Sequence, residues 1–354
     1  MGQPQVSVVL PVWNGERYLR QAIESILEQD FKNFELVIVN DGSTDGTASI
    51  LAEYSADERV RVHTQENCGL VAALNTGVEL ARAGLIARMD ADDISLPNRL
   101  RLQYAFMEAH PEVAVLGSSI TLIDAVGRQR KTQTYPQGPE AVAASMLQGC
   151  ALAHPAVMMR RAAVIKVGGY RQAFQHAEDY DLWLRIMGNH RIDNLPEALL
   201  RYRIHPESVS LVHNTQQALG ALTARYAYLR RSAGQPDPFL HQTSPVCLAD
   251  LAKLNLTESE ESEFSMMRFK IAQRQKTPAL TEISGALQRA WDLRAHQRRG
   301  RLVRHVLMPG AFILMENGRT LAGLGWIACA FLREPLSAAW MLLRQSVKIL
   351  GVGR

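Results

Sequence analysis

The chain has 354 residues, of which 47% are hydrophobic, and a formal net charge of +4. This size allows a full hydrophobic core and predicts one large domain with an appendage, or two domains. The four cysteines are scattered without a Cys-x-x-Cys pair, which argues against a disulfide framework or a zinc site and favours a reducing cytosol. No apolar run reaches ~18 residues, so we expect no membrane-spanning helix, and we also expect no signal peptide and no nucleic-acid partner.

Strand and helix patterns alternate over the first ninety residues. Four short β-branched or apolar runs predict buried strands: residues 6–10, 34–39, 60–63 and 85–87. Alternation with short connections is typical of a parallel sheet with helices on both faces. Ligands bind beyond the carboxyl ends of such strands, so we expect the following loops to form one pocket: residues 11–14, 40–45, 66–69 and 90–93.

The fourth predicted strand leads into the sequence Arg88-Met89-Asp90-Ala91-Asp92-Asp93. Three carboxylates in four positions repel one another, and at the end of a buried strand they need a cation or hydrogen-bond donors. Oxygen ligands suit Mg²⁺ or Mn²⁺, which complete their shells with water and phosphate oxygens. The stretch therefore predicts a metal site, and a solvated acidic turn that caps the next helix is the alternative. No Gly-rich phosphate loop follows the first strand, so a metal would have to neutralise any bound phosphates.

The second half of the core is less regular. Residues 113–123 predict a strand with a following hairpin, and residues 150–160 predict a strand-like run. A packed helix is expected to begin at Glu178 and Asp179, although capping of the helix dipole alone could explain these two acids. Residues 199–205 predict an edge strand that ends in a histidine.

Six segments in this order resemble the inverting family 2 glycosyltransferases, which have the GT-A fold. They are residues 8–15, 39–45, 67–77, 90–93, 178–183 and 202–205. Trp13 stands where the family more often has tyrosine, and its ring can still line a base pocket. The resemblance covers residues 5–212, so we expect a GT-A domain over residues 1–212, in the α/β class with a mostly parallel sheet. Residues 213–354 are expected to form a helical C-terminal region.

The resemblance implies a role for each candidate residue. Those expected to bind the nucleotide or the donor sugar are Pro11, Val12, Trp13, Asn14, Asp41, Asn67, Arg88, Asp90 and Arg203. Those expected to bind Mg²⁺ or Mn²⁺ are Asp92 and His205. Asp179 is expected to be the catalytic base, with Glu178, His154 and Trp183 on the acceptor side. Structural alternatives stay open for three of them, because His154 and His205 could serve only local contacts and Trp183 could pack in the core.

The implied reaction moves a sugar from a UDP- or dTDP-linked donor to an acceptor hydroxyl in glycan assembly. A metal would stabilise the departing diphosphate while a carboxylate on the other face of the sugar removes the acceptor proton. Two alternatives remain. A sugar-nucleotide nucleotidyltransferase shares the sheet and the metal but normally has a Gly-rich, basic loop after the first strand. A non-catalytic sugar-nucleotide binder is the other.

The end of the chain is basic. From Ala286 onward, eleven Arg and Lys residues stand against three Asp and Glu residues. Basic clusters near residues 298–304 alternate with apolar pieces at 321–332 and 336–343, a pattern that suits a helix at a membrane interface. We expect peripheral contact with the cytoplasmic leaflet, where a lipid-linked acceptor would be found. An amphipathic helix that covers the core or a homo-oligomer interface is the alternative.

Overall fold

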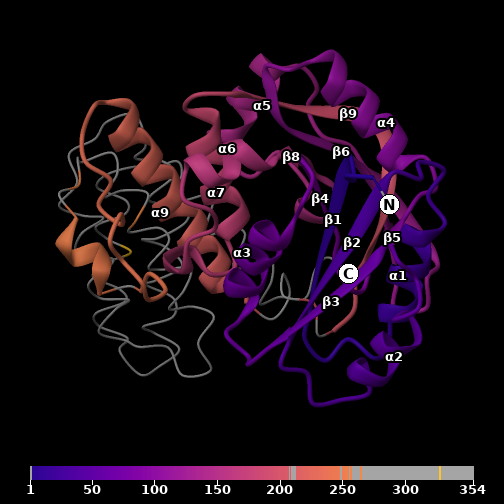
Figure 1. Ribbon diagram of the computed structural model, residues 1–354. Helices are drawn as coiled ribbons and strands as arrows, with labels where there is room; N and C mark the ends of the chain where they lie inside the picture. Colours follow the sequence, from indigo (N-terminus) through magenta and orange to yellow (C-terminus); the bar gives the residue numbers. More distant parts are fainter. Residues whose placement is uncertain are drawn as a thin grey trace, which may run out of the picture. The chain divides into compact units, whose positions relative to one another are not determined.

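The computed structural model describes residues 2–206, 208, 213–247 and 249–254, and the single residues 256, 264 and 327. The chain divides into two compact units, Met1–Val246 and Cys247–Arg354. The first unit contains the sheet and also helix α9 (Asn214–Ser232), which follows residue 212 in the sequence (Figure 1). The domain division at residue 212 stays a prediction, and the basic clusters near residues 298–304 lie outside the described residues.

The first half of the sheet is parallel. Strands β1 (Val6–Val12), β2 (Phe34–Asp41), β3 (Val60–Gln65) and β4 (Leu85–Arg88) lie in the order β3-β2-β1-β4. In this register Val6 lies opposite both Phe34 and Leu85. The four predicted strands are confirmed, and their carboxyl ends meet at one edge of the sheet.

Helices α1 (Leu19–Leu27) and α3 (Leu70–Leu80) cover opposite faces of these strands. Ile23 of α1 belongs to the same buried cluster as Val8 of β1. Gly77 of α3 lies against the next strand residue, Val9, where an added Cβ would be 2.3 Å from a Val9 methyl carbon. Since successive strand residues point to opposite faces, the two helices lie on opposite sides of β1.

The second half of the sheet is mixed. The order continues β4-β8-β6-β9-β5, and β7 pairs with the outer part of β6. The bounds are β5 (Ile94–Ser95), β6 (Val113–Ile123), β7 (Gln129–Gln133), β8 (Met158–Arg160) and β9 (Arg191–Arg203). Strand β8 is antiparallel to both β4 and β6, whereas β9 is parallel to β6. The predicted α/β class is confirmed, and so is the hairpin after β6.

Two strand predictions in this half were wrong in detail. The run at residues 150–160 forms a strand only over Met158–Arg160, because the residues around Pro155 form a 3₁₀ turn, η1 (His154–Ala156). The strand predicted at the sheet edge is interior, since β9 lies between β6 and the two-residue strand β5.

The remaining helices surround this sheet (Figure 1). They are α2 (Thr47–Glu53), α4 (Arg99–Ala109), α5 (Pro139–Met146), α6 (Arg161–Lys166) and α7 (Glu178–Met187), with a 3₁₀ turn η2 (Gln172–Phe174) before α7. Helix α9 packs beside α7. Within the described part of the chain, no helix is both long and apolar enough to cross a bilayer.

Candidate active site

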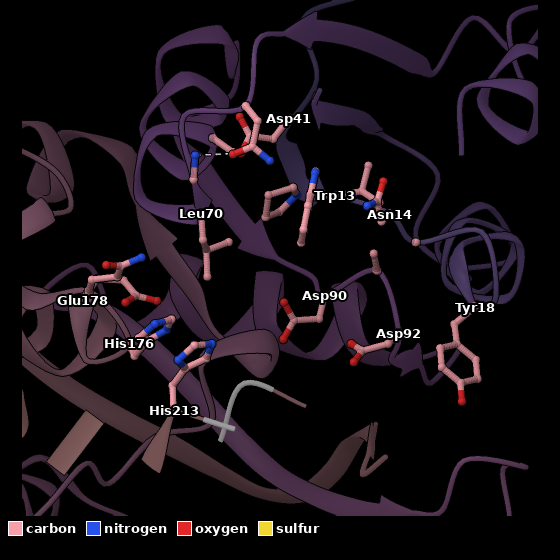
Figure 2. Close-up of a pocket in the computed structure, with 18 of the residues that line it drawn as sticks. Trp13, Asn14, Tyr18, Asp41, Leu70, Asp90, Asp92, His176, Glu178 and His213 are labelled. Atoms are coloured by element: carbon pink, nitrogen blue, oxygen red, sulfur yellow. Dashed lines mark hydrogen bonds between the residues drawn. The ribbon is translucent and has the colours of Figure 1, made fainter. Parts of the chain in front are cut away.

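A cavity of about 720 Å³ lies at the carboxyl ends of the parallel strands. Its wall comes from the loops after β1, β2, β3 and β4, from the start of α7, and from the residues after β9. Figure 2 shows Glu178, His176 and His213 on the left of the view, across the cavity from Asn14 and Tyr18. The predicted site residues that line it are Pro11, Val12, Trp13, Asn14, Asp41, Asn67, Asp90, Asp92, Glu178 and His205.

The end of β2 fixes one carboxylate at this cavity. Asp41 is 3% exposed, and its Oδ1 accepts hydrogen bonds from Gln65 Nε2 (2.8 Å) and the Cys68 amide (3.0 Å). Its Oδ2 accepts one from the Gly69 amide at 2.8 Å, and Gly69 has φ +85°, a conformation that favours glycine. The loop after β3 therefore holds the Asp41 carboxylate in one orientation, with lone-pair capacity left on Oδ2.

The loop after β1 is held against the loop after β2. The Asn14 amide donates to Ser43 Oγ (3.0 Å), and Asn14 Oδ1 accepts from the Thr44 amide (2.8 Å). These reciprocal bonds fix Asn14 in a left-handed conformation, with φ 51°. Trp13, directly before it, is 59% exposed and lines the cavity, so its ring is available to a planar ligand.

The acidic loop after β4 brings three carboxylates together. Ligand oxygens of Asp90, Asp92 and Asp93 all lie within 4.8 Å of one another. Burial, together with the charge of Asp92, raises the pKa of Asp90 against the opposing effect of Arg88. Burial and the charges of Asp92 and Asp90 raise the pKa of Asp93 well above its usual value. A cation at this loop would favour the ionised carboxylates, as expected of a metal site.

Two of the predicted metal ligands come together from distant parts of the chain. His205 Nε2 lies 3.0 Å from Asp92 Oδ2, although 113 positions separate the two residues. Adjacent ligands of an octahedral ion at about 2.1 Å are about 3.0 Å apart, so this pair fits the coordination geometry of Mg²⁺ or Mn²⁺. The tertiary structure thus supplies both an acidic cluster and an adjacent imidazole.

Arg203 has a different position from the one that the family resemblance implies. Its side chain is buried, and its guanidinium donates to the Asp92 carbonyl (2.7 Å) and to Gln21 Oε1 (2.8 Å) while it stacks over Tyr18. Its backbone amide donates to Asp93 Oδ1 at 2.8 Å. The described cavity wall does not include Arg203, so the structure favours a role in holding the acidic loop over direct contact with the diphosphate.

Arg88 is buried at the end of β4, next to the acidic loop. It is 2% exposed, and its Nη1 lies 2.5 Å from Asp90 Oδ2. Its charge opposes the raised pKa values of Glu178 and Asp179, so Arg88 is electrostatically coupled to both carboxylates at the start of α7. Arg88 Nε has no hydrogen-bond partner among the described residues. Arg88, which the resemblance places among the donor-binding residues, is not part of the described cavity wall.

The two acids at the start of α7 have different surroundings. Glu178 is 5% exposed and lines the cavity, and burial followed by the charge of Asp179 raises its pKa to about 7. Asp179 is partly exposed and is not part of the described cavity wall. Its Oδ2 lies 3.9 Å from Cys150 Sγ, and burial raises its pKa, with Asp90 as a further contributor. Asp179 thus lies beside the cavity, and the charge of Asp90 in the acidic loop affects its pKa.

His154 and Trp183, both predicted on the acceptor side, pack against each other in the interior of the protein. Trp183 is fully buried, and its ring packs edge-on against His154 with the centroids 6.0 Å apart. His154 Nε2 lies 3.0 Å from the Tyr170 hydroxyl, and burial lowers the pKa of His154 well below its usual value. Neither residue is in the described cavity wall, so these contacts favour the structural alternative for both.

Several cavity residues could not be inferred from the sequence. His176, with φ 70°, and His213 stack with their rings 4.0 Å apart and nearly parallel. Tyr18, Leu70 and Gln175 also line the cavity. The sequence offered no signal for the histidine pair, because His213 precedes α9 and reaches the cavity only through tertiary packing.

The sheet, with the acidic loop and the cavity at one edge, has the arrangement of the GT-A fold. Among solved structures, the chain is similar to S. aureus TarS residues 1–349 in complex with UDP-GlcNAc, with TM-score 0.58 and 18% identity over 97% of this chain and 92% of that one. It is also similar to the mannosyltransferase PcManGT from Pyrobaculum calidifontis in complex with GDP-Man and Mn²⁺, with TM-score 0.50 and 17% identity over 99% of this chain and 88% of that one. These likenesses concern the fold.

Sequence comparison identifies the family. The family model described as "Glycosyl transferase family 2" matches residues 7–168. The O-antigen biosynthesis glycosyltransferase WbnJ of Escherichia coli is 39% identical over 57% of this chain and 81% of its own length. The putative glycosyltransferase EpsE of Bacillus subtilis is 39% identical over 56% of this chain and 73% of its own length. The amylovoran biosynthesis glycosyltransferase AmsE of Erwinia amylovora is 34% identical over 58% of this chain and 78% of its own length.

The chain therefore belongs to glycosyltransferase family 2, and the sequence-based recognition is confirmed. It is a transferase with relatives in polysaccharide biosynthesis, which favours this function over a nucleotidyltransferase or a silent binder.

Proposed function

We propose that this glycosyltransferase moves a sugar from a UDP- or dTDP-linked donor to an acceptor hydroxyl, with inversion at the anomeric carbon, in the assembly of a cell-surface glycan. The observation that carries the proposal is one cavity that joins Asp41, the Asp92–His205 pair and Glu178. A sugar donor consists of a nucleoside, a diphosphate and a sugar in this order. Asp41 would contact the nucleoside, the Asp92–His205 pair would hold the ion at the diphosphate, and Glu178 would lie toward the sugar. The names of the E. coli and E. amylovora relatives support a role in glycan assembly.

The nucleobase end of the cavity suits a pyrimidine. Uracil and thymine carry one ring N–H, which a fixed carboxylate such as Asp41 accepts, and their flat faces can stack on Trp13. Asn14 and Asn67 line the same end and offer amide groups to the carbonyl oxygens of the base or to the ribose. Asp90 lines the middle of the cavity in the view of Figure 2, between Glu178 and Asp92, where it can accept hydrogen bonds from ribose or sugar hydroxyls.

Asp92 and His205 would hold the divalent ion. When bound, the ion supplies Lewis-acid stabilisation for the negative charge of the departing diphosphate. Mg²⁺ prefers oxygen ligands, so the imidazole of His205 favours Mn²⁺ of the two candidates. Arg203 holds the Asp92 carbonyl in place from below the loop.

The acceptor side must supply a base. The acceptor oxygen forms a bond to the anomeric carbon as the carbon–oxygen bond to the diphosphate breaks, and the acceptor proton passes to a carboxylate. We assign this base to Asp179, because it is partly exposed beside the cavity while Glu178 lines the donor cavity itself. Arg88 opposes the rise in the pKa of Asp179 and so favours its ionised form.

A donor screen tests the function and separates the two carboxylates. The purified chain is titrated with UDP-glucose and dTDP-sugars, with and without Mn²⁺. The release of the nucleoside diphosphate, UDP or dTDP, is measured. We expect Asp179→Asn to abolish transfer and to leave nucleotide binding intact, whereas Glu178→Gln should retain measurable turnover. Full activity in Asp179→Asn together with an inactive Glu178→Gln would move the base to Glu178. An acceptor product with retained anomeric configuration by NMR would contradict the inverting mechanism.

The same proposal extends to the location of the enzyme. We propose a cytoplasmic enzyme that contacts the membrane peripherally through its basic C-terminal region and uses a glycan or lipid-linked acceptor. The support is the excess of eleven Arg and Lys over three Asp and Glu from Ala286 onward. Deletion of the residues after Gly300 should lower recovery in the membrane fraction. Unchanged recovery would favour the alternative, a helix that covers the core or forms a homo-oligomer interface.

A further inference from the structure

Helix α9 lies unusually close to the loop that leads into α7. A Cβ added at Gly220 of α9 would lie 2.9 Å from Ala177 Cβ, and 3.9 Å from the carbonyl oxygens of Phe174 and Gln175. Carbon atoms in contact are normally about 3.5–4.0 Å apart. A side chain at position 220 would therefore have to push Ala177 away by up to about 1 Å.

The turn after α9 makes a second connection to α7. Arg171 donates through Nη1 to Asp237 Oδ2 (2.9 Å) and through Nε to Asp181 Oδ2 (3.0 Å), so it joins the two carboxylates. The Asp181 side chain is fully buried and that of Asp237 is 5% exposed. Arg185 of α7 completes the network on Asp181, with Nε at 2.9 Å, and Arg231 of α9 lies 2.5 Å from Asp237.

Apolar and backbone contacts reinforce this connection. The ring of Phe239 packs edge-on against that of Phe174, with the centroids 5.6 Å apart. The Val246 amide donates to the Ala173 carbonyl at 2.8 Å. The segment from α9 to Val246, residues 214–246, thus contacts the η2–α7 loop (residues 172–177) at both its backbone and its side chains.

This loop forms one wall of the cavity. It carries Gln175 and His176 to the cavity and ends directly before Glu178. His176 has φ 70°, a conformation that a histidine adopts only when its surroundings hold it. The family match ends at residue 168, so neither the loop nor the segment behind it is described by the family model.

We propose that segment 214–246 fixes the acceptor-side wall of the active site, and that Gly220 and Asp237 are positioning residues for the carboxylates at the start of α7. The inference rests on the proposed function for its catalytic consequence. A displacement of about 1 Å at a reacting group can lower the rate about 100-fold. The residues assigned to the nucleotide lie on the loops after β1 to β4, outside the contacts given above for segment 214–246, so UDP binding should be unaffected.

The test compares two variants with matched controls. Gly220→Val places a side chain against Ala177, and Ser232→Val makes the same residue at an exposed position of the same helix. Asp237→Asn breaks the buried ion pair with Arg171, and Asp30→Asn breaks the exposed pair with Arg101 at 2.8 Å. UDP binding is read as the change in intrinsic tryptophan fluorescence on addition of UDP with Mn²⁺, to which Trp13 in the cavity contributes.

We expect both variants to lower transfer about 100-fold with UDP affinity within about twofold of wild type, and the controls to match wild type. Hydrogen exchange of the intact protein should rise at residues 174–179 and stay unchanged at residues 11–15. Unchanged exchange at 174–179 in both variants would overturn the inference, as would an equal loss of UDP binding and transfer. The exchange measurement needs no donor, so it decides the inference even if wild-type protein binds no UDP, the result that would defeat the proposed function.

Discussion

The surroundings of Glu178 predict a protein that gains stability when this carboxylate is removed. The side chain is 5% exposed, and its Oε2 has no hydrogen-bond partner in the described part of the chain. Burial, and then the charge of Asp179, raise its pKa from 4.5 to about 7. The folded state therefore binds this proton more tightly than the unfolded state, and the ionised form destabilises the fold.

The sign and size follow from this difference. The stability that comes from the protonated carboxyl is complete below about pH 4.5 and is lost as the pH rises through about 7. At about 1.4 kcal/mol for each pKa unit, the loss at high pH is on the order of 3 kcal/mol. Glu178→Gln keeps the shape and cannot ionise. We expect this variant to be within about 1 kcal/mol of wild type near pH 5 and to be more stable by about 3 kcal/mol at pH 8.5.

Urea unfolding at pH 5, 6, 7, 8 and 8.5 measures this difference. Glu197→Gln, at an exposed position on β9, reports what the substitution does away from the site. The free energies of unfolding of Glu178→Gln and wild type are compared at each pH. If their difference is the same at pH 5 and pH 8.5, the buried carboxylate does not titrate as described. A stabilised variant with reduced transfer would mark Glu178 as a residue kept for function at a cost in stability.

Three further substitutions test the site and the fold. Asp92→Ala should weaken Mn²⁺ binding by at least about tenfold in a direct titration, because it removes the carboxylate 3.0 Å from His205. Gly77→Ala should destabilise the fold by about 1–3 kcal/mol in thermal unfolding, since the new methyl group would lie 2.3 Å from a Val9 methyl carbon. Asn75→Ala should lower the free energy of unfolding by about 1–3 kcal/mol, because it removes the two hydrogen bonds of 2.9 Å to the Tyr170 amide and carbonyl.

Each of these has a matched comparison. Asp57→Ala removes a carboxylate outside the cavity and should leave Mn²⁺ binding unchanged. Gly84→Ala adds a methyl group where no atom lies within 4 Å, so a loss equal to that of Gly77→Ala would refute the packing argument. Asn75→Asp retains the acceptor for the Tyr170 amide and loses the donor to its carbonyl, so it should lie between wild type and Asn75→Ala.

Much of the first half of the fold could be predicted because its signals are local. The β-branched runs that form β1 and β2, and the helical spacing that forms α1, are set by residues close together in the chain. The rule that ligands bind beyond the carboxyl ends of parallel strands then placed Asp41 and Asp90 at one edge, where the structure has them. The second half could not be predicted as well, because β8 reverses direction between β4 and β6.

The partners of each site residue required the folded chain. Asp92 meets His205 because β9 runs beside β6 and brings the end of the strand to the acidic loop. The same packing buries Arg203 under that loop, where the family resemblance had implied contact with the diphosphate. Sequence alone also could not show that Glu178 enters the cavity while its neighbour Asp179 lies beside it.

The sequence by itself determined the class of the sheet, the family, and the stretch in which the acidic residues lie, since each depends on neighbouring residues and their order. Only the tertiary structure decided which side chains face the cavity, which are buried as supports, and that segment 214–246 contacts the loop before α7. The physical reason is that burial, charge pairing and pKa values depend on contacts between residues tens to more than a hundred positions apart, and those contacts exist only in the folded chain.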